Sequence, residues 1–147
     1  MKLSRALINV ALVLFLVGLL AACQSTKNPG MMIGNIQGNT SDETEVYAIV
    51  AKVQEYISAS EWDKWLALYS DDAILTKGDE KVSKSEMRKS VEGIKYKITD
   101  MEVLQKTIGV DEAVVSTRFL GNGKEQLESY KLKKIDGIWL IVEETNP

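Results

Sequence analysis

The feature that most constrains this chain is an uninterrupted apolar run that ends at its only cysteine. No side chain between Val10 and Ala22 is polar, and Cys23 follows directly. Lys2 and Arg5 precede the run and small alanines end it, which is the pattern of a secretory signal peptide. We therefore expect residues 1–22 to be a signal peptide, so that the folded body is built from the rest of the chain.

The end of this run, Leu20-Ala21-Ala22-Cys23, resembles the lipobox of bacterial lipoproteins. The resemblance implies cleavage before Cys23 and attachment of fatty chains such as palmitate to its sulfur. Two or more chains hold a soluble body stably on a membrane. In a Gram-negative cell, Gln24 at the next position implies an envelope protein on the periplasmic face of the outer membrane. The alternatives are an uncleaved anchor helix over residues 6–22, which is near the short limit of a membrane span, and a buried structural cysteine.

The residue types that are missing exclude several classes of site. The chain has no histidine, which removes Ser-His-Asp triads and the common histidine metal sites. With Cys23 lipidated, no disulfide can form. We expect no cofactor and no metal. Loss of Lys2 and Arg5 with the signal peptide takes the net charge from −3 to −5, which argues against binding to nucleic acid or to anionic lipid.

Residues 23–43 are expected to be the lipidated cysteine and a flexible tether. Gly, Asn, Ser and Thr dominate this segment, and Pro29-Gly30 is a turn signal. Twenty such residues have a root-mean-square reach of roughly 25 Å. Met31, Met32 and Ile33 are unusual in a tether, and they either lie on the body or form a short recognition segment. Residues 44–147 are expected to be one domain.

The first half of this domain has helical patterns. From residue 44 one helix face is apolar, with Asp42 as the expected N-cap. A second helix is expected over residues 61–70, capped by Ser60, and a brief strand over residues 73–75. A capping box over residues 83–86 opens a third helix, which Gly93 is expected to stop. The apolar stripe of the first helix consists of Val46, Ile49, Val50, Val53 and Ile57.

The second half has the pattern of antiparallel strands. We expect them at residues 98–108, 113–120, 126–135 and 138–143, because turn signals separate these segments. Asp136-Gly137 between two apolar-rich runs is the strongest of these signals. Helices followed by a strand meander indicate an α+β fold.

Two segments resemble the nuclear transport factor two-like superfamily, which includes SnoaL-like proteins. Residues 60–75 look like its second helix and the Asp-Asp-Ala-hydrophobic exit from it, and residues 134–142 are similar to its final hairpin. The resemblance implies three N-terminal helices packed on a strongly curved antiparallel sheet of about four main strands plus a short one. It also implies a cone with a pocket at its wide end.

Four aromatic residues are candidates for lining that pocket. Trp65 and Tyr69 lie four apart and share a helix face, whereas Tyr130 and Trp139 lie on strands. An aromatic-lined apolar cavity is the usual small-molecule site, but the alternative is that these four residues simply fill a core with little phenylalanine.

No catalytic residue can be named from the sequence. An Asp-Arg-Asp site would need Arg118 to point inward, yet its alternation in the strand predicts an outward side chain. Lysines 124, 131, 133 and 134 alternate with Glu125 and Glu128, which predicts a solvated strand face.

The sequence therefore favours a membrane-anchored envelope lipoprotein without catalysis. Its cone would bind a small apolar ligand or assemble with protein, including a second copy through the sheet. The alternative is a small isomerase or hydrolase that uses Tyr130 or Tyr69 with a carboxylate. A third possibility is an inhibitor of another protein.

Overall fold

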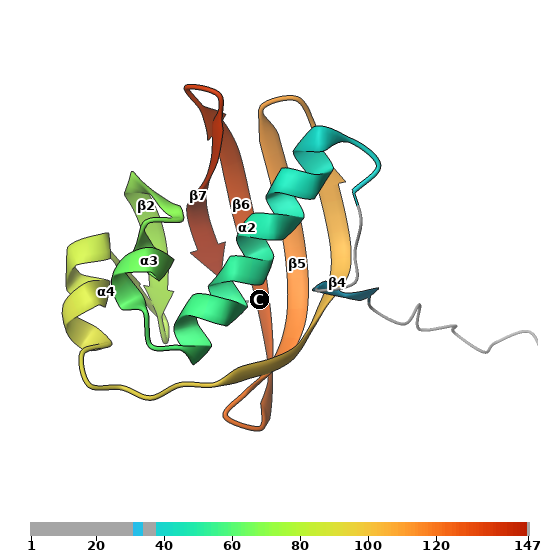
Figure 1. Ribbon diagram of the computed structural model, residues 1–147. Helices are drawn as coiled ribbons and strands as arrows, with labels where there is room; N and C mark the ends of the chain where they lie inside the picture. The colour runs from blue at the N-terminus through green and yellow to red at the C-terminus, as the bar shows by residue number, and fades with distance from the viewer. Residues whose placement is uncertain (1–30, 34–37, 147) are drawn as a thin grey trace, which may run out of the picture.

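A computed structural model of the chain describes residues 31–33 and 38–146 (Figure 1). The expected signal peptide, Cys23 and residues 24–30 and 34–37 of the expected tether lie outside these residues. Within the described residues there are three helices and seven strands. The helices are α2 (Ser41–Ser58), α3 (Trp62–Leu66) and α4 (Lys84–Ser90). The strands are β1 (Met31–Met32), β2 (Tyr69–Lys77), β3 (Glu80–Val82), β4 (Ile98–Ile108), β5 (Glu112–Gly121), β6 (Lys124–Ile135) and β7 (Ile138–Thr145). No helix among these residues is long and apolar enough to cross a membrane.

All strands form one curved sheet in the order β1-β4-β5-β6-β7-β2-β3. The four main strands, β4 to β7, are antiparallel neighbours, as expected. The expectation of a wholly antiparallel sheet is wrong at one place, because β2 pairs with β7 in parallel. These two strands are far apart in the sequence, so no hairpin forces them to be antiparallel. The α+β class is confirmed, with more strands than the sequence indicated.

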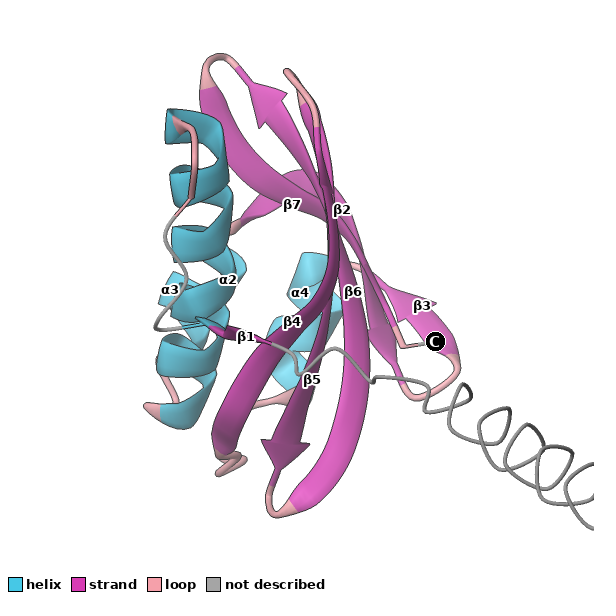
Figure 2. Cartoon of the chain, turned by 90° about the vertical axis from the view of Figure 1, so that its right-hand side faces the viewer, coloured by secondary structure: helices cyan, strands magenta, loops and turns pink. Residues whose placement is uncertain are grey.

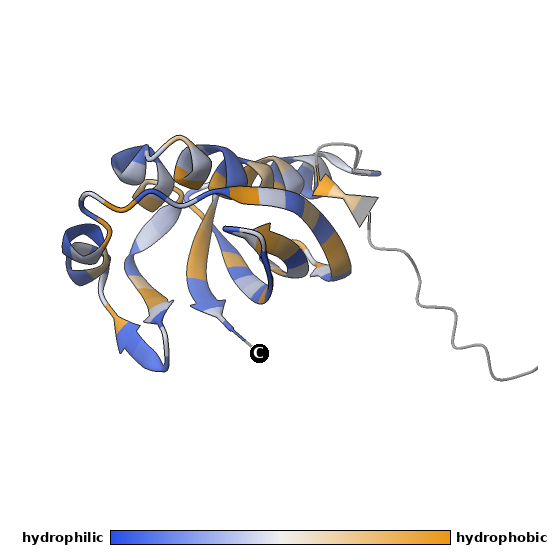
Figure 3. Ribbon diagram, turned by 90° about the horizontal axis from the view of Figure 1, so that it is seen from below, coloured by the Kyte–Doolittle hydropathy of each residue, from blue (hydrophilic) through white to orange (hydrophobic). Residues whose placement is uncertain are grey.

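The long helix α2 crosses the concave face of the sheet and supplies most of the helical core (Figures 1 and 2). Val46, Val50 and Val53 are fully buried, and Ile49 and Ile57 are partly buried against the same core. This confirms the predicted apolar stripe. In Figure 3, orange apolar residues lie on both α2 and the strands beneath it, whereas blue polar residues mark several strand ends.

Two helix boundaries differ from the prediction. Thr40, rather than Asp42, is the N-cap of α2, because its side chain accepts a hydrogen bond from the Glu43 N–H. The second helix is much shorter than residues 61–70. Ser60 has a positive φ of 59° and does not cap it, and the chain is already extended at Tyr69, where pairing with β7 begins.

The capping box and the Asp136-Gly137 turn are confirmed. Ser83 and Glu86 form the predicted capping box of α4, which ends at Ser90, shortly before Gly93. Asp136 and Gly137 both have positive φ, which is the conformation of a tight β-hairpin turn.

The segment Met31–Ile33 lies on the body, as the first of its two interpretations predicted. Met31 and Met32 pair with Val103 and Glu102 of β4, and Ile33 is 6% exposed. This short strand occupies the edge of the sheet beside α2 (Figure 2).

Candidate functional site

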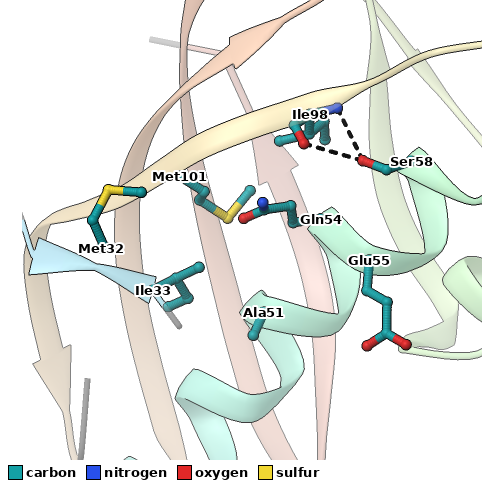
Figure 4. Close-up of a pocket in the computed structure, with 8 residues that line it drawn as sticks. All are labelled: Met32, Ile33, Ala51, Gln54, Glu55, Ser58, Ile98 and Met101. Carbon is teal, nitrogen blue, oxygen red and sulfur yellow. Dashed lines mark hydrogen bonds between the residues drawn. The ribbon is translucent and has the colours of Figure 1, made fainter. Parts of the chain in front are cut away.

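A groove lies between α2 and β4, and the docked N-terminal segment forms its third side (Figure 4). Its volume is about 420 Å³, within the range of small-molecule sites. Apolar side chains form most of the wall. The lining residues are Met32, Ile33, Ala51, Gln54, Glu55, Ser58, Ile98 and Met101.

Polar groups of the groove have different roles. The Ser58 hydroxyl accepts from the Ile98 N–H at 3.0 Å and donates to the Ile98 carbonyl at 3.1 Å, so it fixes the end of α2 to β4. The Gln54 amide points toward Met101, whereas the Glu55 carboxylate points away from the groove (Figure 4). Among the described lining residues, Gln54 is therefore the side chain whose amide donor and acceptor face a ligand there.

A second polar feature lies deeper in the cone, where two tyrosines each contact a glutamate. Tyr69 donates its hydroxyl proton to the Glu144 carboxyl, and Tyr130 donates to the Glu128 carboxyl. Tyr69 also accepts from the Trp65 indole N–H at 3.2 Å. These residues come from α3, β2, β6 and β7, and Tyr130 pairs with Glu144 across β6 and β7, so this network of tyrosines and glutamates joins α3 to the sheet.

Burial raises the pKa of both carboxyl groups. The pKa of Glu144 rises to about 8, because burial and the nearby Glu128 charge outweigh the Tyr69 hydrogen bond. The pKa of Glu128 rises to about 7, again mainly through burial of its carboxyl group, although the residue as a whole is half-buried. The two carboxyl groups therefore hold their protons to higher pH than exposed glutamates do.

A β-bulge places Glu144 in the interior. Leu132 pairs with Ile141, but Lys131 pairs with Glu143 and Tyr130 with Glu144, so Val142 is an extra residue in β7. Such a bulge changes which side chains point inward beyond it. Glu143 consequently lies near Lys81, at 3.5 Å, and Glu144 beneath Tyr69.

The structure brings three of the four candidate aromatic residues together. Trp65 and Tyr69 meet edge to face at 5.7 Å, and Tyr130 belongs to the same network of tyrosines and glutamates. Trp139 is buried elsewhere and donates its indole N–H to Asp42 at 3.1 Å. None of the four lines the groove between α2 and β4, and a ligand-lining role for them remains a prediction.

Of two side chains predicted to point outward from the sheet, one does and the other does not. Arg118 points outward and pairs with Glu102 at 2.6 Å. Glu128, by contrast, was expected on the solvated face and instead contacts Tyr130 inside the cone. The pattern of lysines around Glu128 concealed it, because Glu128 shares the inner face with Tyr130 by the period of two. A homodimer through the sheet remains a prediction.

The raised carboxyl pKa values predict how stability depends on pH. Glu144 binds its proton more tightly in the folded state than in the unfolded state. Its contribution to the free energy of unfolding of the wild type is therefore greatest below about pH 4.5 and is lost as the pH rises toward 8. Glu144→Gln removes this penalty. The free energy of unfolding of the variant, relative to wild type, should increase between pH 5 and pH 9 by a few kcal/mol, since a tenfold change in proton affinity corresponds to about 1.4 kcal/mol.

Urea denaturation across this pH range measures the effect. Glu143→Gln is the matched control, because Glu143 lies one residue away on the other side of the strand. A difference between Glu144→Gln and wild type that stays constant from pH 5 to pH 9 would contradict the prediction.

Comparison with known proteins identifies the fold. No protein-family profile and no curated protein matches the sequence. Solved structures do match. An NTF2-like protein of unknown function from Shewanella baltica has 11% identity, a TM-score of 0.62, and coverage of 74% of this chain and 94% of its own. A domain of unknown function with a cystatin-like fold from Nostoc punctiforme has 14% identity, a TM-score of 0.63, and coverage of 74% and 78%.

A protein from Novosphingobium aromaticivorans that is named as a candidate aromatic ring hydroxylase has 14% identity and a TM-score of 0.58. It covers 74% of this chain and 90% of its own. At such identities the likeness concerns the backbone alone, because one fold serves many functions. The chain therefore has the NTF2-like, or cystatin-like, fold.

Proposed function

We propose that the chain is a membrane-anchored binding module whose groove between α2 and β4 takes a small, mostly apolar ligand. The observation that carries this proposal is the groove itself, about 420 Å³ in volume and walled by apolar side chains. Pockets of this size with few polar groups are the usual sites for small molecules.

The lining indicates the chemistry of the ligand. Met32 and Met101 offer flexible, polarisable surfaces that adapt to irregular apolar shapes. Gln54 can hydrogen-bond one polar group of the ligand, and no cationic side chain among the described residues lines the groove. The ligand class is therefore a neutral apolar molecule with one hydrogen-bonding group.

Membrane anchoring through Cys23 is the second part of the proposal. It rests on the Leu20-Ala21-Ala22-Cys23 sequence and on the basic and apolar segments before it. Lipid chains on Cys23 would hold the domain in the cell envelope, at the periplasmic face of the outer membrane in a Gram-negative cell.

A second candidate function is proton-transfer catalysis of the isomerase type, and the Tyr–Glu network favours it. A general base works best with a pKa near the working pH, which describes Glu128, and a neutral carboxylic acid such as Glu144 can donate a hydrogen bond. Buried carboxyls with raised pKa values are also candidates for functional groups in general.

Filling the groove should abolish ligand retention. Ala51→Phe places a ring in the groove on α2, and mass spectrometry of the gently extracted protein should show a bound small molecule in wild type and none in the variant. Ala48→Phe is the matched control, because Ala48 is an exposed alanine on the same helix that does not line this groove. Equal retention by the two variants would show that the ligand, if bound, sits elsewhere.

Lipidation is tested by radiolabelled palmitate. Cells that express the wild-type chain should incorporate label into the protein, and cells that express Cys23→Ser should not. Equal labelling of both proteins would refute anchoring through Cys23.

Catalysis is tested by deuterium incorporation next to the carbonyl of cyclic ketones in heavy water, followed by NMR. The wild-type protein should accelerate exchange, and both Glu128→Gln and Glu144→Gln should reduce the rate about a hundredfold or more, since a positioned acid or base usually contributes at least that much. If Ala51→Phe abolishes ligand retention but leaves the deuterium exchange rate unchanged, the groove and the Tyr–Glu network have separate functions. The variant that carries both glutamine substitutions is the control. A wild-type exchange rate no higher than the rate of this variant would exclude the activity for the compounds used.

A further inference from the structure

The docked segment Met31–Ile33 determines where the N-terminal part of the chain joins the domain. Its two paired residues lie against Glu102 and Val103 of the edge strand β4, and Ile33 is buried at the rim of the groove. Strand β1 is the outermost strand at that end of the sheet, and β3 is the outermost at the other. The N-terminal connection is thus made at one edge of the sheet and not at its centre.

This attachment shortens the link between a lipidated Cys23 and the domain. About eight peptide steps separate Cys23 from Met31, and a fully extended chain spans at most about 3.6 Å per step, or roughly 30 Å. If the link ran to the start of α2 at Ser41, about eighteen steps would allow roughly 65 Å. The docked segment therefore more than halves the greatest distance between anchor and domain.

The charge of the domain offers no competing means of orientation. The chain after the signal peptide has a net charge of −5, so anionic lipid headgroups repel rather than attract it. Close to the docked segment, Met32 and Leu104 are exposed apolar side chains, 37% and 44% exposed. The position of the link is then the main determinant of which side faces the membrane.

We propose that the edge of the sheet formed by β1 and β4 is the surface that the anchored protein turns toward the lipid bilayer. This inference rests on the anchoring proposed above. The groove between α2 and β4 adjoins β1 and so opens near the bilayer, whereas α4, β2 and β3 lie at the far end of the sheet (Figures 1 and 4). A ligand of the groove would accordingly be an apolar molecule that enters from the membrane side.

Energy transfer to labelled lipids tests this orientation in the full lipidated chain. The only cysteine is blocked by its lipid, so a new cysteine can be labelled uniquely. Leu104→Cys reports on the β4 edge, and Asp79→Cys, in the exposed turn between β2 and β3, reports on the far edge. Five strand spacings of about 4.8 Å, roughly 24 Å, separate β4 from β3 across the sheet.

In vesicles of neutral phospholipid with acceptor-labelled headgroups, transfer from position 104 should exceed transfer from position 79. Ile33→Asp, which places a charge in a buried site, should undock the segment and bring the ratio of the two transfer efficiencies toward one. Ile33→Val is the matched control and should keep the wild-type ratio. Met32→Pro, which removes a backbone donor from β1, is a second undocking variant in case Ile33→Asp does not fold.

Equal transfer from both positions in vesicle-bound wild-type protein would overturn the proposal. Wild-type protein that fails to sediment with vesicles would instead refute the anchoring, and the orientation with it. Amide hydrogen exchange of the unlipidated Cys23→Ser chain separates these cases. Slow exchange at the paired residues of β1, lost in Ile33→Asp, would support docking, whereas fast exchange in the parent chain would overturn it.

Discussion

The packing of α2 against the concave face of the sheet is the interaction on which the rest of this structure depends. Val46, Val50 and Val53 are completely buried there, and each contributes about 1.5–3 kcal/mol of burial free energy. The curved sheet packs around this helix (Figure 2). The groove lies along its β4 side, and buried residues of β6 and β7 form the interior beside it. Both candidate sites are therefore consequences of one helix lying across one curved sheet.

Elements with strong local signals could be predicted from the sequence. The valine stripe of α2, the capping box of α4 and the Asp136-Gly137 turn depend on neighbours within a few residues, and all three are confirmed. The end of the second helix could not be predicted, because Tyr69 leaves the helical pattern to pair with Ile141, which lies far away in the sequence. Tertiary pairing overrides a short helical pattern in such cases.

The candidate sites were only partly accessible to sequence reasoning. The sequence indicated Trp65, Tyr69 and Tyr130 as interior aromatic residues, and they do lie in one network, but their partner carboxylates were missed. Glu128 lies in a lysine-rich strand whose pattern is typical of a solvent-exposed face. Only the two-residue spacing between Glu128 and Tyr130 could have predicted that both side chains point inward. The groove between α2 and β4 depends on Met32 and Ile33, whose contacts with the body have no local signal.

The extra residue at Val142 has a consequence for how this fold varies. Two successive glutamates occupy opposite environments, one against a lysine near the surface and one beneath a tyrosine in the core, and only the local count of residues decides which is which. If β7 continued past Ile141 without the bulge, Glu143 instead of Glu144 would pair with Tyr130 and face the interior, with no change in the composition of the strand end. Proteins of this shape could thus gain or lose an interior acid by a change of spacing, with no new acidic residue arising.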